Sequence, residues 1–67
     1  MPAGHVADFH ALRAKLTRTY GADAFDAFIE HPPAPDSLKG AADEHLWRAL
    51  AGCVEILGPE HVARLRA

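Results

Sequence analysis

Residues 38–57 read LKGAADEHLWRALAGCVEIL, and this stretch decides the fold that the sequence predicts. At about 100° per residue, its apolar side chains form two adjacent stripes on one helix. The first stripe contains Leu38, Ala42, Leu46, Ala49, Cys53 and Ile56, and the second contains Trp47, Leu50, Val54 and Leu57. Together they cover roughly half of the circumference, whereas a helix with one neighbour needs about 100°. We therefore predict a central helix 38–57 that touches two different surfaces.

Two glycines weaken this predicted central helix. Gly40 costs up to about 1 kcal/mol relative to alanine in the first turn, so the firm part of the helix is expected to begin near Asp43. Gly52 lies close to Ala49 and Ala51 and forms with them a flat patch of small side chains. A neighbouring helix could approach closely at this patch.

A first helix is predicted over residues 5–20, where apolar side chains recur at steps of three and four. Its apolar face contains Val6, Phe9, Leu12, Leu16 and Tyr20. Gly21 then offers the left-handed backbone conformation that commonly closes a helix. Residues 1–4 are expected to be a loose end.

A short second helix is predicted over residues 24–31. Asp23 is its expected N-cap, and the two prolines that follow His31 end it, because proline lacks the amide hydrogen and restricts the residue before it. The apolar side consists of Phe25, Phe28 and Ile29. Two turns are not stable in isolation, so this side must be anchored in a core.

The remaining segments complete an all-α fold in a single domain, 1–67. Asp36 or Ser37 is expected to cap the central helix after a stiff proline-rich connector. The pair Gly58-Pro59 ends the central helix and starts a last short helix, 60–67, with Val62 and Leu65 facing inward. We predict three principal helices plus this short C-terminal helix, with the first helix antiparallel to part of the central one.

Length and composition limit how such a fold is stabilised. The chain has 67 residues, one cysteine and a formal net charge of −2. A domain of this size is marginal alone and commonly needs a disulfide, a metal or a partner. A single cysteine excludes an internal disulfide and fits a reducing cytoplasm. No targeting signal and no long apolar run occurs, so we expect a cytoplasmic protein with no membrane partner.

The five histidines are candidate metal ligands or bases. None pairs with another at a spacing of three or four, and neither H-E-x-x-H nor E-x-x-H occurs. His5 and Asp8, three residues apart, could hold a metal together, but two ligands are too few without tertiary help. Cys53 lies on an apolar face without a local cation, which favours an inert buried thiol. We therefore predict no catalytic residue, no cofactor and no metal, and hence no enzyme.

The triad Asp36-Ser37-Leu38, which is expected to open the central helix, resembles the attachment site of carrier proteins. The resemblance implies a phosphopantetheine group on Ser37. The chain departs from that family because Lys39 follows the triad and because few residues remain after Gly58 for the usual closing helices. An Asp-Ser pair is also what an ordinary helix cap looks like.

A nucleic-acid-binding regulator is the alternative function. The basic residues form two clusters, Arg13, Lys15 and Arg18 in the first helix and Arg64 and Arg66 in the last. The segment VEILGPEHVARLRA is similar to a helix-turn-helix, but that motif needs a turn of three or four residues, and Pro59 follows Gly58 directly. Because the net charge is −2, the basic footprint expected for nucleic acid is missing and this partner is disfavoured.

The predicted function is a non-enzymatic protein–protein interaction module, a small accessory subunit or inhibitor. It would self-associate as a homodimer or dock on a protein partner through the apolar face of the central helix. The expected contact residues are Trp47, Leu50, Val54 and Leu57. Trp47 fits a core position and an interface anchor equally well.

Overall fold

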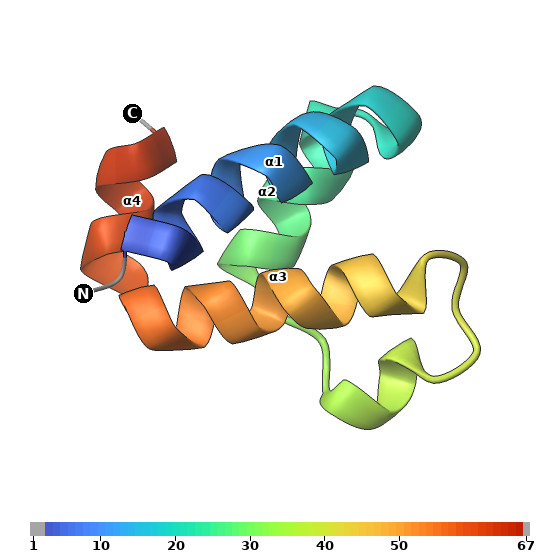
Figure 1. The fold of residues 1–67 in the computed structure, drawn as a ribbon. Helices are drawn as coiled ribbons and strands as arrows, with labels where there is room; N and C mark the ends of the chain where they lie inside the picture. Colours follow the sequence, from blue (N-terminus) through green and yellow to red (C-terminus); the bar gives the residue numbers. More distant parts are fainter. Residues whose placement is uncertain (1–2, 67) are drawn as a thin grey trace.

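The computed structural model describes residues 3–66, and within them every regular element is a helix. The elements are α1 (Ala3–Tyr20), α2 (Ala22–Glu30), the short 3₁₀ helix η1 (Pro35–Leu38), α3 (Glu44–Leu57) and α4 (Pro59–Arg66), drawn in Figure 1. The prediction of an all-α fold with three principal helices and a short C-terminal helix is confirmed. None of the helices described is both long and apolar enough to cross a membrane.

Helices α1 and α3 pack against each other and run in opposite directions (Figure 1). The start of α1 lies beside the end of α3, where His5 approaches Cys53. The end of α1 lies beside the start of α3, where Tyr20 bonds to Asp43. α2 packs on α1, and α4 packs on α3. The predicted antiparallel arrangement of the first and central helices is confirmed.

The core takes a buried side chain from each of the four α-helices. Its members are Phe9, Leu16, Phe25, Leu50 and Val62. Phe9 of α1 and Phe25 of α2 meet edge to face with ring centroids 5.8 Å apart, a favoured geometry for aromatic pairs. The central residues of the apolar faces predicted for the first, second and last helices therefore point inward, whereas Tyr20 at the end of the first is 38% exposed. The core joins all four α-helices.

The central helix is shorter than predicted. α3 begins at Glu44, because Gly40 at φ 81° and Asp43 at φ 56° lie in the left-handed region that a right-handed helix cannot contain. Leu38 is buried, but as the last residue of η1. The prediction of one continuous helix 38–57 is therefore wrong for residues 38–43, and the weak first turn expected at Gly40 is a complete break.

The predicted start of α2 is also corrected. α2 begins at Ala22 with Gly21 as its N-cap, at φ 96°, so Asp23 lies inside the first turn and does not cap the helix through its side chain. Gly21 thus separates α1 from α2 with a conformation that favours glycine. At the N-terminus, α1 already includes Ala3 and Gly4. The loose end predicted for 1–4 is wrong for these two residues, and residues 1–2 lie outside the described part.

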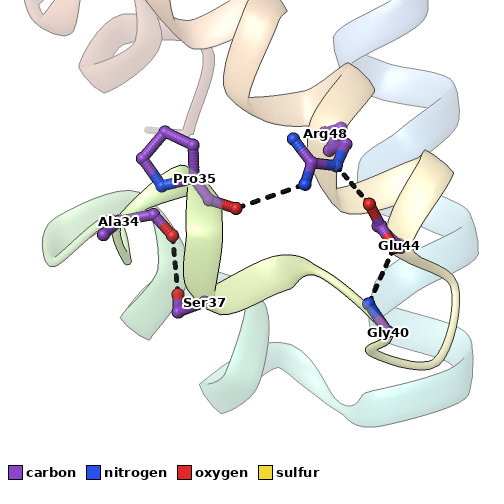
Figure 2. A network of polar contacts seen from close by, with 6 residues as sticks. All are labelled: Ala34, Pro35, Ser37, Gly40, Glu44 and Arg48. Atoms are coloured by element: carbon purple, nitrogen blue, oxygen red, sulfur yellow. Dashed lines mark hydrogen bonds and ion pairs between the residues drawn. The ribbon is translucent and has the colours of Figure 1, made fainter.

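A polar network ties η1 and the following turn to α3 (Figure 2). Glu44 accepts hydrogen bonds from the Gly40 amide at 2.9 Å and from Nε of Arg48 at 2.5 Å. Arg48 also donates through Nη2 to the Pro35 carbonyl at 3.3 Å. The Gly40 amide and the Arg48 guanidinium favour the ionised carboxylate, so the pKa of Glu44 is lowered.

Ser37 belongs to this region but does not cap α3. Its Oγ donates to the Ala34 carbonyl at 2.6 Å inside the turn that forms η1 (Figure 2). Asp36 likewise lies within η1, and no α-helix begins at either residue. The prediction that Asp36 or Ser37 caps the central helix is therefore wrong, and Ser37 lacks the helix-opening position on which the carrier-protein resemblance rested.

Candidate functional site: the outer face of α3

The residues predicted to contact a partner lie on the inner side of α3. Leu50 is fully buried, at 0% exposure. Trp47, Val54 and Leu57 are partly buried and pack against the core. The chain therefore covers the second apolar stripe only in part: Leu50 exposes no surface to a partner, while Val54 borders a surface hollow. Contact with a partner through Trp47, Val54 and Leu57 stays a prediction.

Trp47 belongs to an aromatic cluster formed by three helices. Its ring lies 4.8 Å from that of Phe28 and 5.5 Å from that of Tyr20, centroid to centroid. Phe28 comes from α2 and Tyr20 from the end of α1. Of the two roles considered for Trp47, these contacts describe the core role.

The opposite side of α3 carries an apolar edge that the chain does not cover. Ile56 is 59% exposed, the highest value of any large hydrophobic side chain described. Together with Ala49 and Gly52 it borders a hollow of about 440 Å³, whose other wall is formed by Ala11 and Leu12 of α1. This edge belongs to the first apolar stripe predicted from the sequence.

Gly52 lies at the centre of this side of α3. A Cβ atom added to it would meet no other atom within 4 Å, so its outer side is open. Beyond it lies a charged edge, where Arg48 and Glu55 border a second hollow of about 230 Å³. The side chain of Arg48 is 44% exposed although it pairs with Glu44.

We call this surface the outer face of α3. It consists of Arg48, Ala49, Gly52, Glu55 and Ile56. A charged edge and an apolar edge flank a centre without a side chain, and the face includes Ala49 and Gly52 of the flat patch that the sequence predicts. A third hollow, of about 320 Å³, lies farther round the helix between Val54 and the prolines that follow α2.

Three possible metal ligands meet at the larger hollow. One ligand atom each of His5, Asp8 and Cys53 lies within 4.8 Å of the other two. Burial raises the pKa of the Cys53 thiol, and the negative charge of Asp8 raises it further. The sequence paired His5 with Asp8 but missed Cys53. The signal that could have found it was the predicted antiparallel packing, which places the end of the central helix beside the start of the first.

The two basic clusters approach each other but are partly engaged within the chain. Arg13 donates through Nη1 to the Leu65 carbonyl at 3.1 Å. Arg66 forms ion pairs with Asp26 at 3.1 Å and with Glu30 at 3.2 Å. The other three basic residues of these clusters are exposed, namely Lys15, Arg18 and Arg64. Two of the five cations proposed for nucleic acid therefore serve contacts between helices.

Comparison of the chain with protein-family models, curated proteins and solved structures gives no match. Since a fold does not by itself define a function, the outer face of α3 and the ligand cluster beside it are the basis for the functional inference.

Proposed function

We propose that this protein is a non-enzymatic interaction module that self-associates as a homodimer through the outer face of α3. The observation that carries the proposal is that this face is complementary to itself. In a two-fold symmetric dimer the same patch is used by both subunits, so each residue must suit the partner residue that symmetry places opposite it.

The complementarity becomes clear when two copies of α3 cross at Gly52 in opposite directions. The two-fold axis then lies between the helices and is perpendicular to both. This symmetry places the charged edges of the two copies side by side, and likewise the two apolar edges. On the charged edge, Arg48 of one copy then faces Glu55 of the other, and the pair occurs twice. On the apolar edge, the large Ile56 of each copy faces the small Ala49 of the other.

Gly52 allows the two helices to come close at the crossing point. The distance between packed helices depends on the side chains at their contact, and here both partners present no side chain. Closure would also cover Ile56 and the rim of the 440 Å³ hollow. Removal of this apolar surface from water favours association, and a small domain gains most from such additional burial.

Nucleic-acid binding has less support. It depends on positive charge gathered on one surface, whereas Arg13 and Arg66 are held by groups of the same chain. A buried free thiol, Cys53, suits a reducing compartment. We therefore propose the cytoplasm as the site of the homodimer.

Sedimentation equilibrium of the Gly52→Leu variant tests the proposal. A Cβ atom at position 52 meets no other atom within 4 Å in the monomer, so a side chain can start there without a clash, and loss of a helical glycine stabilises α3. In the dimer, the same side chain would hold the helices apart. We expect dimerisation to weaken by about tenfold or more, equivalent to about 1.4 kcal/mol, with unchanged or increased helical circular dichroism.

Ala14→Leu is the matched control, because Ala14 is an exposed helical residue of α1 outside the outer face of α3. This variant should dimerise like the wild type. A wild-type protein that stays monomeric at high concentration, or a Gly52→Leu variant that associates as strongly as the wild type, would contradict the homodimer.

A further inference from the structure

The cluster of His5, Asp8 and Cys53 joins two helices that are distant in sequence. His5 and Asp8 are one turn apart on α1, so their side chains share one face of that helix. Cys53 faces them from near the end of α3, and the three donor atoms lie within 4.8 Å of one another. Neither helix alone holds all three groups.

The donor atoms are free for a ligand. Within residues 3–66, neither the imidazole of His5 nor the carboxylate of Asp8 takes part in a hydrogen bond or an ion pair with a protein group, and Cys53 is a free thiol. Cys53 is 6% exposed, whereas Asp8 is exposed, and all three border the 440 Å³ hollow. The hollow gives an ion a path to them from solvent.

The ligand set selects a class of metal. Imidazole and thiolate are ligands of zinc and related transition metals, while calcium and magnesium prefer oxygen atoms alone. A thiolate and a carboxylate together carry two negative charges, which balance a divalent cation. An ion held at the buried thiol would therefore form a site with no net charge, which reduces the cost of taking it out of water.

The distances between the three donor atoms fit a metal site in which these atoms move closer together when the ion binds. In a tetrahedral zinc site with bonds of about 2.0–2.3 Å, neighbouring ligand atoms lie about 3.5 Å apart. The present spread of up to 4.8 Å requires movements of about 1 Å. His5 and Asp8 are not buried, so changes in their side-chain torsions can supply these movements while Cys53 stays in place.

We propose that His5, Asp8 and Cys53 form a zinc-binding site that fastens the start of α1 to the end of α3. On binding, the S–H bond of Cys53 is replaced by an S–Zn bond, and the proton leaves to solvent without any redox change. Neutral His5 binds through one ring nitrogen and Asp8 through a carboxylate oxygen. Water from the hollow that all three residues border could serve as the fourth ligand of a tetrahedral ion.

A metal bound at this site would stabilise a small domain. Structural metals are a common means of stabilising domains of this size, and the free energy of metal binding adds to the free energy of folding when the unfolded chain lacks the site. The site does not depend on the homodimer, because its three ligands come from one chain and none belongs to the outer face of α3. The two proposals meet only at the 440 Å³ hollow, which Ala49, Gly52 and Ile56 of that face also border.

Titration of the reduced full-length protein with Co²⁺, followed by competition with Zn²⁺, tests the site. We expect one ion per chain, the near-ultraviolet charge-transfer band of a cobalt–thiolate bond and the visible bands of tetrahedral cobalt. Zn²⁺ should abolish these bands and raise the thermal unfolding temperature. Each of His5→Ala, Asp8→Asn and Cys53→Ser should weaken binding by about tenfold or more.

His10→Ala is the matched control, because His10 is an exposed histidine on α1 outside the cluster. It should bind like the wild type. Binding without a charge-transfer band, binding retained in Cys53→Ser, or loss of binding in His10→Ala would each overturn the site. Cys53→Ala serves if the serine variant does not fold.

The same titration of Glu55→Arg separates this site from the homodimer. Glu55 does not border the cluster's hollow, while its reversal is expected to weaken association. Zinc binding that persists in this variant shows that the site belongs to the single chain, and loss of binding there contradicts it. Measurement of dimerisation in chelator, in turn, tests the dimer without the metal.

Discussion

The phenol hydroxyl of Tyr20 donates a hydrogen bond of 2.5 Å to Oδ2 of Asp43. Tyr20 is the last residue of α1, and Asp43 immediately precedes α3 with a left-handed backbone at φ 56°. Aspartate tolerates this conformation better than most residues with a side chain. The bond therefore fastens the break before α3 to the end of α1.

The hydrogen bond from the neutral phenol to Asp43 raises the pKa of Tyr20 above its ordinary value of 10.0, and partial desolvation and the negative charge of Asp43 raise it further. A raised pKa in the folded state means that the bond stabilises fully below pH 10 and is lost as pH rises through the folded pKa. Tyr20 is the only tyrosine, so ultraviolet absorbance of the phenolate measures this pKa directly.

Asp43→Asn tests the cause of the shift. Asparagine also tolerates the left-handed conformation and still accepts the hydrogen bond, but it removes the charge. The pKa of Tyr20 should then fall towards 10.0. Identical titration curves for both proteins would mean that the charge of Asp43 does not contribute to the shift.

The lowered pKa of Glu44 should make the stability of the protein depend on pH in the acidic range. The pKa of Glu44 is lowered in the folded protein from an ordinary value of 4.5. Its contribution is therefore present above that value and is lost as pH falls through the lower folded pKa. Glu44→Gln should reduce the loss of stability between neutral pH and pH about 3, measured as the urea midpoint.

Glu60→Gln is the control for this effect. Glu60 also lies in the first turn of a helix, but among the described residues it accepts no side-chain hydrogen bond like those of Glu44. Its replacement should leave the acid dependence close to that of the wild type. An equal effect of both replacements would point to a general loss of negative charge.

Gly40 and Gly52 should respond to alanine with opposite signs. Gly40 has φ 81°, so Gly40→Ala should destabilise the protein by about 1 kcal/mol. Gly52 is inside α3, so Gly52→Ala should stabilise the monomer by about 0.5–1 kcal/mol. Urea unfolding at low concentration checks both. Stabilisation by Gly40→Ala would instead favour the continuous helix 38–57.

Leu50 and Ile56 distinguish the inner side of α3 from its outer face. Leu50→Ala should cost about 2–5 kcal/mol, enough to unfold much of so small a protein, because Leu50 is fully buried. Ile56→Ala should keep the fold and weaken association. Circular dichroism and sedimentation measure the two effects, and a folded but monomeric Leu50→Ala variant would restore the contact surface first predicted.

The sequence predicts which segments form helices, but it does not predict where each helix starts and ends. Spacing of apolar residues predicts which side of α1 is buried, since Phe9 and Leu16 fall on one face. The same spacing predicts a central helix that starts at Leu38. This start is too early, because Leu38 is a buried residue of η1 that lies at a helical spacing from the apolar residues of α3. η1 and α3 are separated only by the backbone conformation of the residues between them. The apolar pattern does not predict the positive φ of Asp43.

The contact residues predicted from the sequence lie on the inner side of α3, whereas the contact surface proposed from the structure lies on its outer face. The fraction of the α3 surface that is apolar predicts how much of this helix is buried. It does not predict which helices, or which partner, cover it. α1, α2 and α4 together cover the inner stripe in part, Leu50 included, and leave Ile56 outside. Cys53 joins His5 and Asp8 only through tertiary packing, which a local spacing rule does not detect.

A charge exchange between Arg48 and Glu55 tests the homodimer most directly. Arg48→Glu places like charges opposite each other in its own dimer, and so does Glu55→Arg. A mixed dimer of the two variants has both pairs attractive. Exposed pairs contribute about 0.2–1 kcal/mol each, so two pairs should favour the mixed dimer by about tenfold.

Native mass spectrometry of an equimolar mixture of these two variants in chelator provides the measurement. The Arg48 bond to Glu44 is lost in every Arg48→Glu chain and kept in every Glu55→Arg chain. Two mixed dimers contain the same chains as one homodimer of each kind, so this loss cancels in the exchange between them. The homodimer account predicts that mixed dimers predominate over both homodimers. A statistical mixture of dimers, or monomers alone for the mixture and the wild type, would contradict it.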